Sequence, residues 1–147
     1  MRRAHTRAHP VHAMETSKTM HEPVHTPIQT RFCDTDMLGH INNAAFAEYS
    51  ELGRVGLFAS AEAKVTNLIL ARLAIDYVAQ VTLDQEVVVA SRVEKIGRTS
   101  IVIAQEVLAD GEVAARVECV VVYFDYEAQG PAPVPNDWRT AFGFEAV

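Results

Sequence analysis

The side chains best suited to chemistry lie together in one short segment of this sequence. Residues 34–43 read Asp-Thr-Asp-Met-Leu-Gly-His-Ile-Asn-Asn and so combine carboxylates, an imidazole and amides. Asn42 and Asn43 are good N-cap residues, so a helix is expected to begin here. A helix N-terminus carries free N–H groups and about half a positive charge, which favour the oxyanion that develops on an attacked carbonyl. Asp36, one turn upstream, could attack that carbonyl or activate water against it.

The helix expected after this loop has an apolar stripe that must face another element. Its large apolar residues recur at helical spacing and are Phe46, Tyr49 and Leu57. Gly53 falls in the same stripe, and Gly56 lies beside it. Each glycine lowers helix propensity by about 1 kcal/mol relative to alanine, so the pair indicates a close approach to something flat. A sheet packed against this helix would explain both.

Alternating apolar and polar residues predict five strands around that helix. One short strand is expected before the loop, at 28–33. Four more follow the helix, at 67–78, 86–96, 99–109 and 112–126. Asp110-Gly111 between the last two is a strong hairpin signal, because both residues tolerate positive φ. One strand, a long helix and four antiparallel strands make an α+β fold in which the helix lies on a single sheet.

Composition and charge narrow the classes of protein and partner. With 147 residues, of which 49% are hydrophobic and 22% charged, the chain can bury one core. No apolar run approaches the roughly 20 residues that span a bilayer, so we expect a cytoplasmic protein with no membrane partner. The formal net charge of -6 argues against nucleic acid, because a phosphate backbone requires a basic face. A small-molecule substrate fits better.

The N-terminal segment differs from the rest of the chain. Residues 1–25 hold five of the six histidines and almost no aliphatic periodicity, so a disordered tail is expected. His5, His9 and His12 have the spacing of metal ligands on one helical face. They lack an acidic or cysteine partner, so a plain leader segment is the favoured interpretation and no metal site is predicted.

The globular domain is expected to end before the C-terminus. It should span residues 26–128, which contain all the strand patterns and the helix. Residues 129–147 include three prolines, which cannot donate to a sheet, so this C-terminal tail should leave it.

Several other side chains are interpreted as structural. They are Tyr49 and Tyr77 in the core, Glu51 and Arg54 as an i,i+3 pair on the helix, and Cys33 and Cys119 as reduced thiols inside strands.

The pattern Asp-x-Asp-x-x-Gly-His-Ile-Asn-Asn resembles the hotdog-fold thioesterases of the 4-hydroxybenzoyl-coenzyme A thioesterase type. The residues that extend the resemblance along the helix are Tyr49, Glu51 and Arg54. Residues 74–81 and 93–100 resemble the second and third strands of that family, and the similarity runs over about 26–126. It implies a hotdog fold, in which a curved antiparallel sheet of about five strands wraps a long helix. It also implies a homodimer or homotetramer with active sites at the interface.

The resemblance also implies roles for single residues of the loop. Asp36 aligns with the catalytic carboxylate of the family, and the backbone N–H that polarises the thioester carbonyl falls on Asn43. The similar loop of plant acyl-carrier-protein thioesterases implies that Asp36 and His40 are both catalytic. That group uses an asparagine where this chain has Leu38, which leaves Asp36 as the main actor. Phe46 stands where many relatives carry tyrosine, so a hydroxyl contact is lost there.

Two neighbours in the loop have simpler interpretations beside the chemical ones. Asp34 is expected to bond loop amides, the commonest role of an aspartate beside a turn. His40 would serve either as a hydrogen-bonded structural residue or in catalysis and substrate orientation.

A second group of polar residues suits the phosphates of coenzyme A. A charged fork and hydroxyls at a strand junction match phosphate oxygens. The group is Lys95, Arg98, Thr99 and Ser100. A solvated hairpin is the equal alternative.

The sequence therefore predicts a thioesterase that hydrolyses an acyl thioester, acyl-coenzyme A or an acyl-carrier-protein ester, without a cofactor or a metal. One alternative is a hotdog protein that binds the thioester without cleaving it. Another is a hotdog dehydratase or hydratase, although those relatives place their aspartate and histidine differently.

Overall fold

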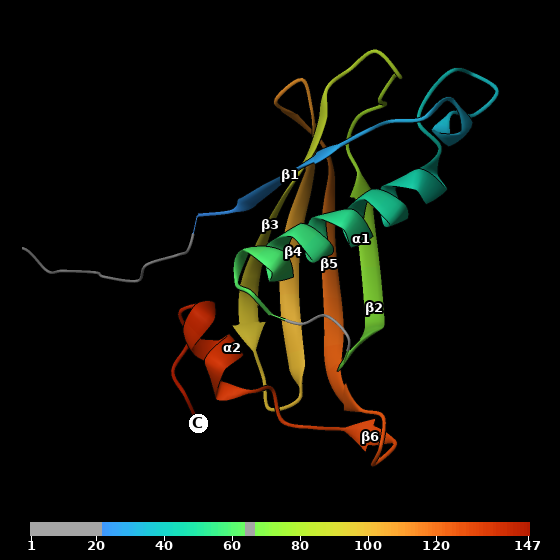
Figure 1. Cartoon of the computed structure of the whole chain (residues 1–147). Helices are drawn as coiled ribbons and strands as arrows, with labels where there is room; N and C mark the ends of the chain where they lie inside the picture. The colour runs from blue at the N-terminus through green and yellow to red at the C-terminus, as the bar shows by residue number, and fades with distance from the viewer. Residues whose placement is uncertain (1–21, 64–66) are drawn as a thin grey trace, which may run out of the picture.

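The computed structural model describes residues 22–63 and 67–147 of the chain (Figure 1). The strands are β1 Val24–Ile28, β2 Leu68–Tyr77, β3 Val87–Ile96, β4 Ser100–Ala109, β5 Glu112–Asp125 and β6 Gly130–Pro131. The helices are α1 Asn43–Ser60 and α2 Asn136–Ala141, with a 3-10 turn at Phe32–Asp34.

Five strands form one antiparallel sheet in the order β1-β3-β4-β5-β2, and the short β6 pairs with the end of β5. The long helix α1 crosses one face of this curved sheet, while α2 sits beside the end of β3, where β4 begins (Figure 1). The chain is thus an α+β structure with one main helix on one sheet, as the sequence predicts.

The start and the packing of α1 follow from the residues that predicted them. Asn42 is the N-cap, and its side chain accepts a hydrogen bond from Ala44 N. A Cβ on Gly53 would stand 2.5 Å from Val89 Cγ1 of β3, and one on Gly56 would collide with Thr26 of β1. Both glycines therefore let the helix lie directly on the sheet, which confirms the interpretation of the two residues.

The four strands after the helix are confirmed to within one residue at each end, and the Asp110-Gly111 turn has the positive φ values of 50° and 83°. The first strand was predicted wrongly at 28–33. It lies at Val24–Ile28, because Asp34 draws the following segment into a 3-10 turn by accepting from Arg31 N. Pro27 is tolerated within the strand because β1 is an edge of the sheet.

The core forms two clusters along α1. One surrounds Phe46 and Tyr49 at the N-terminal half of the helix, and the other surrounds Phe58 at its C-terminal half. Trp138 and Phe142, on and just after α2, pack their rings on Phe58 in the second cluster. Part of the C-terminal segment therefore folds back onto the core after it leaves β6.

The two cysteines differ in whether they meet the expectation of a buried strand position. Cys119 is buried in β5, but Cys33 is exposed in the 3-10 turn, so its assignment to a strand interior was wrong. His5, His9 and His12 lie outside the described residues. The described helices include none that is long and apolar enough to cross a membrane.

Candidate active site

The loop before α1 is folded around the carboxylate of Asp36. Its Oδ1 accepts hydrogen bonds from Leu38 N at 2.8 Å and from His40 N at 3.1 Å. The backbone N–H of Asp36 donates to the carbonyl oxygen of His40 at 2.7 Å, and Gly39, with φ of 80°, allows the chain to reverse between them. One carboxylate oxygen is thus held by loop amides, while Oδ2 accepts no hydrogen bond from the residues that the structure describes.

The first turn of α1 leaves one N–H group available beside this carboxylate. The side chain of Asn42 accepts a hydrogen bond from Ala44 N, and the carbonyl oxygen of Asn42 accepts one from Ala45 N. Asn43 occupies the first helical position, where a backbone N–H has no acceptor within the helix. This N–H therefore remains for an external oxygen, with the positive end of the helix dipole behind it.

A cavity of about 270 Å³ brings these groups together. Its lining from the loop and the helix is Asp36, Leu38, His40, Ile41, Asn43 and Phe46. The other wall is formed by residues 77–80 at the end of β2. The three residues predicted to be catalytic thus share one cavity, which can place a carbonyl against the Asn43 N–H and a nucleophile beside Asp36.

Asp34 has a different position and a different role. It is buried, and its carboxylate accepts from Arg31 N and Nη2 and from the hydroxyl of Tyr49. Burial raises the pKa of this carboxyl, but the hydrogen bonds from Arg31 and Tyr49 outweigh burial and hold the pKa below its usual value. Its backbone oxygen also accepts from Asn42 N at 2.7 Å. Asp34 therefore ties both ends of the loop to α1 and does not line the cavity.

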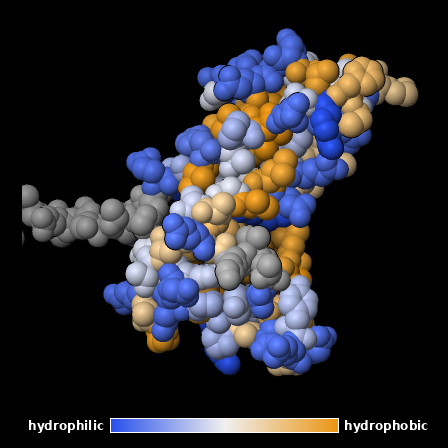
Figure 2. Space-filling model, in the orientation of Figure 1, coloured by the Kyte–Doolittle hydropathy of each residue, from blue (hydrophilic) through white to orange (hydrophobic). Residues whose placement is uncertain are grey.

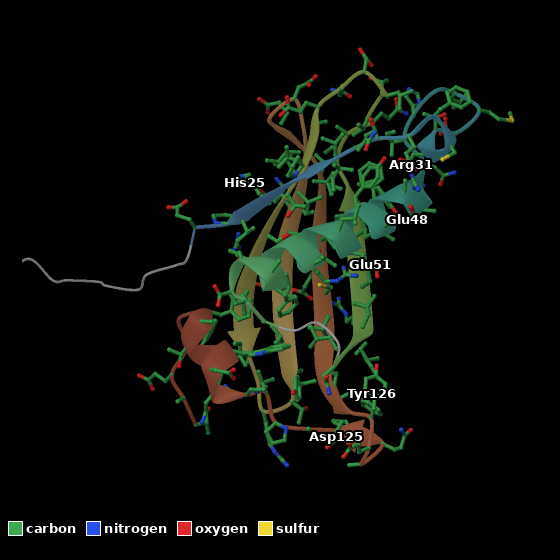
Figure 3. The ribbon with its side chains drawn as sticks, in the orientation of Figure 1. His25, Arg31, Glu48, Glu51, Asp125 and Tyr126 are labelled. Atoms are coloured by element: carbon green, nitrogen blue, oxygen red, sulfur yellow. The ribbon has the colours of Figure 1, made fainter. Side chains whose placement is uncertain are left out.

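Arg31 links buried Asp34 to a glutamate on the exposed side of α1. Its Nη2 lies 2.7 Å from Asp34 and 2.6 Å from Glu48, which stands one turn into α1 on the solvent side (Figure 3). The pKa of the Arg31 guanidinium is raised by the hydrogen bonds to Asp34 and Glu48. The loop is thus clamped to the helix by two acidic side chains and one guanidinium.

The residues predicted to bind coenzyme A lie far from this cavity within one chain. Lys95, Arg98, Thr99 and Ser100 lie around the turn that joins β3 to β4. His40 bridges to Thr82, just before the opposite end of β3. Nine steps along that strand span about 30 Å, so a single chain does not bring the two groups together.

Two features of the helix surroundings were missed. Tyr77 was expected in the core, but it is half exposed, lines the cavity and donates its hydroxyl to the carbonyl oxygen of Asn43 at 3.0 Å. Arg54 was interpreted as half of an ion pair with Glu51, yet no such pair forms in the described chain. It is buried and donates to Ser50 Oγ at 2.7 Å instead. The place of Tyr77 at the end of a predicted strand could have indicated that it lies at the site. No feature of the sequence indicated that Arg54 would be buried.

Known proteins share sequence and fold with this chain. The sequence pattern of the family described as the thioesterase-like superfamily matches residues 30–142. A search among curated proteins finds no match. Among solved structures, a thioesterase from Thermus thermophilus, complexed with coenzyme A and Zn, is 34% identical, with a TM-score of 0.74. That similarity covers 81% of this chain and 90% of the Thermus chain.

Two further structures show the same fold. A predicted thioesterase from Bacillus stearothermophilus is 32% identical with a TM-score of 0.75, over 82% of this chain and 93% of that one. A DHNA-CoA thioesterase from Staphylococcus aureus has a TM-score of 0.74 at 21% identity, over 82% of this chain and 88% of that one. With the family pattern over most of the chain and the helix-on-sheet architecture shared, the chain belongs to the thioesterase-like superfamily and is a hotdog-fold thioester hydrolase.

Proposed function

We propose that the protein hydrolyses acyl-coenzyme A thioesters, with Asp36 as general base or nucleophile and the N–H of Asn43 as the donor to the carbonyl oxygen. The observation that carries this proposal is the shared cavity, in which a carboxylate stands beside an unbonded N–H at a helix start. Attack on the carbonyl carbon places negative charge on its oxygen, which the N–H and the helix dipole stabilise. The C–S bond then breaks, and the thiolate leaves and takes the proton that Asp36 removed from water; where Asp36 itself attacks, water then cleaves the resulting anhydride, which frees the acid and supplies the proton for the thiolate.

In this proposal His40 supports Asp36 rather than replacing it. Its backbone N–H holds Asp36 Oδ1 and its side chain lines the cavity. Among the described residues the imidazole makes no hydrogen bond, so it is available to orient substrate or to move a proton to the leaving thiolate.

We prefer coenzyme A to a carrier protein because the β3–β4 turn carries Lys95, Arg98, Thr99 and Ser100, whose charges and hydroxyls suit the phosphates of coenzyme A. A second copy of the chain would bring that group near the cavity. Of the described strands, β2 pairs only with β5 and so ends the sheet with a free edge. Antiparallel pairing of two β2 strands sets the Leu68 end of one beside the Tyr77 end of the other.

The β3–β4 turn belongs to the Leu68 end of the sheet. Leu68 pairs with Tyr123, and Tyr123 N donates to the carbonyl oxygen of Thr99. In the proposed dimer, Arg98 of a second copy therefore lies at the same end as Asp36. It is set back from the joined β2 strands by two strand spacings, about 10 Å. An extended coenzyme can bridge that gap.

Apolar side chains support the same edge as the dimer contact. Exposed apolar residues gather over the middle of α1 and over β2 (Figure 2). They are Leu52 and Val55 on the helix, and Ile69, Leu70, Tyr77 and Val78 on or beside the strand. A free strand edge flanked by apolar residues is completed by a second copy more readily than by solvent.

The direct test is thiol release from acyl-coenzyme A and acyl-carrier-protein esters of matched acyl groups. We expect release from the coenzyme A esters. Binding of both kinds of ester without release would contradict the proposal and favour a non-catalytic binding protein, whereas release from the carrier-protein esters alone would favour a carrier-protein substrate.

A further inference from the structure

Arg54 is a buried cation without a carboxylate partner. Its side chain leaves α1 toward the sheet, and the residue is only 9% exposed. Nη1 donates to Ser50 Oγ, and Ser50 in turn donates to Gln105 Oε1 at 2.6 Å. Within the described part of the chain, Arg54 takes part in no salt bridge. A buried charge is costly unless it is paired, so a carboxylate partner is expected beyond the described residues.

Arg54 also lines a second cavity, of about 150 Å³. The guanidinium carries five N–H donors, and Ser50 Oγ takes one of them while the Cys119 thiol lies close by, so donors remain for a ligand in this cavity. The other lining residues are Glu51 and five apolar residues, Val55, Phe58, Leu68, Leu70 and Val121. Arg54 is thus the one cation in a mostly apolar lining.

This cavity lies in line with the candidate active site. Both cavities are formed between α1 and β2, the first by Asn43 and Tyr77, the second by Arg54 and Leu68. Arg54 lies eleven residues further along the helix than Asn43, which is about 16 Å along the axis. An acyl group whose thioester carbonyl sits at Asn43 could therefore follow α1 and place its far end at Arg54.

We propose that the Arg54 cavity binds a carboxylate at the far end of the acyl group, so that the preferred substrates are thioesters of dicarboxylic acids. This rests on the proposed function, because it assigns the other end of the same substrate. The apolar walls suit the methylene chain, and the guanidinium offers a carboxylate two parallel N–H groups.

Glu51 at the rim of this cavity does not cancel the attraction. It projects from α1 on the side of β2 and is exposed, so water and salt screen its charge (Figure 3). Arg54 is buried and screened far less. Removing the Glu51 charge should therefore strengthen the binding of an anion.

The test uses two coenzyme A thioethers, which cannot be hydrolysed, with chains of equal length that reach about 16 Å. One chain ends in a methyl group and the other in a carboxylate. Titration calorimetry on the full-length protein should give about 10- to 100-fold tighter binding of the carboxylate compound, the range for a hydrogen bond to a charged group. Arg54→Met should abolish this preference, and Arg54→Lys should retain part of it.

Arg72→Met is the matched control, because Arg72 is an exposed arginine paired with Glu118. It should leave the preference unchanged, while Glu51→Gln should widen it. Equal binding of both thioethers by the wild-type protein would overturn the proposal, as would a preference that survives in Arg54→Met. If Arg54→Met does not fold, the test rests on two measurements. These are the preference of the wild-type protein between the two thioethers and the change of that preference in Glu51→Gln.

The same thioethers distinguish this proposal from the proposed function. Thiol release from simple acyl-coenzyme A esters tests the function alone. If Arg54 instead pairs with Glu51 of a second copy, Arg54→Met and Glu51→Gln would both weaken the dimer, and neither would change a preference between the thioethers. That outcome also counts against the carboxylate site.

Discussion

The hydroxyl of Tyr49 donates to Asp34 Oδ2 over 2.8 Å, and this one bond joins the middle of α1 to the loop that carries Asp36. Both residues are buried, with Tyr49 2% and Asp34 4% exposed. Arg31 also donates to this carboxylate, and Asn42 N donates to the carbonyl oxygen of Asp34, so Asp34 fixes the shape of the loop without lining the cavity.

The Asp34–Tyr49 bond should make stability depend on pH at both extremes. The folded-state pKa of Asp34 is lowered, so its contribution is present above the unfolded pKa of about 4 and is lost as pH falls through the folded value. Burial and Asp34 raise the pKa of Tyr49, so its contribution is present below the unfolded pKa of about 10 and is lost as pH rises. Urea unfolding across pH should therefore show a plateau between these limits.

Substitutions at the two residues test that interpretation. Tyr49→Phe should cost about 1.5 to 3 kcal/mol of unfolding free energy at neutral pH, the usual value of a hydrogen bond to a charged group. Asp34→Asn should lower stability at neutral pH and flatten the acid limb. Asp76→Asn, at an exposed carboxylate of β2, is the control and should leave the acid limb as steep as in the wild type. An unchanged acid limb in Asp34→Asn would contradict the assignment.

The contact of α1 with the sheet predicts the effect of one added methyl group. In Gly53→Ala the new Cβ would stand 2.5 Å from Val89 Cγ1 and 2.7 Å from Gln105 Nε2. We expect a loss of about 1 to 3 kcal/mol, despite the better helix propensity of alanine. Gly130→Ala is the control, because a Cβ there meets no atom within 4 Å. Chemical denaturation of both variants compares them; equal stability would mean that the helix has room to shift.

Most of the fold was predictable because its signals are local. The Asn42 cap, the glycines of α1 and the Asp110-Gly111 turn each act over a few residues. The first strand was not, because its placement depends on Asp34, whose carboxylate takes Arg31 N and turns the chain out of the sheet. The pairing of β1 with β3 is a long-range choice that the short alternating segment at 28–33 did not reveal.

The candidate site was predictable only where its residues are neighbours in the sequence. Asp36, His40 and Asn43 fall within one loop, and the structure places them in one cavity. Tyr77 joins them through the return of β2 past the helix start, which no local pattern encodes. The same holds for Arg54, whose burial depends on Ser50 and on strands far along the chain.

The free edge of β2 predicts how the protein assembles. Leu70 is 44% exposed on that strand, and its burial by a second copy would remove apolar surface from water. We expect a dimer or tetramer for the wild type in light scattering at micromolar concentration, and a lower mass for Leu70→Glu. Val147→Glu, at an exposed apolar residue away from β2, should keep the wild-type mass. A wild-type monomer would contradict the proposed assembly.

A mixing experiment can tell which copy supplies the contact to coenzyme A. Arg98→Ala should raise KM more than it lowers kcat, since a phosphate contact binds ground and transition states alike. If Arg98 serves the site of the other copy, mixed dimers of Arg98→Ala with Asp36→Asn contain one intact site. Mixing the two variants should then restore activity above that of either alone. Mixing each variant with itself is the control, and no gain would place Arg98 in its own chain's site or outside both.

Asp36→Asn is the decisive substitution for the proposed chemistry. The amide oxygen of asparagine can still accept from Leu38 N and His40 N, so the loop and the assembly should remain as in the wild type. Only the charge that attacks the carbonyl or takes a proton from water is lost, and such a loss lowers kcat by about 10²- to 10⁴-fold. Asp34→Asn should lower kcat less and stability more, because Asp34 holds the loop and does not line the cavity. Circular dichroism and thiol-release kinetics on both variants give this order. Near-native kcat in Asp36→Asn would remove Asp36 from the mechanism and make His40 the next candidate base.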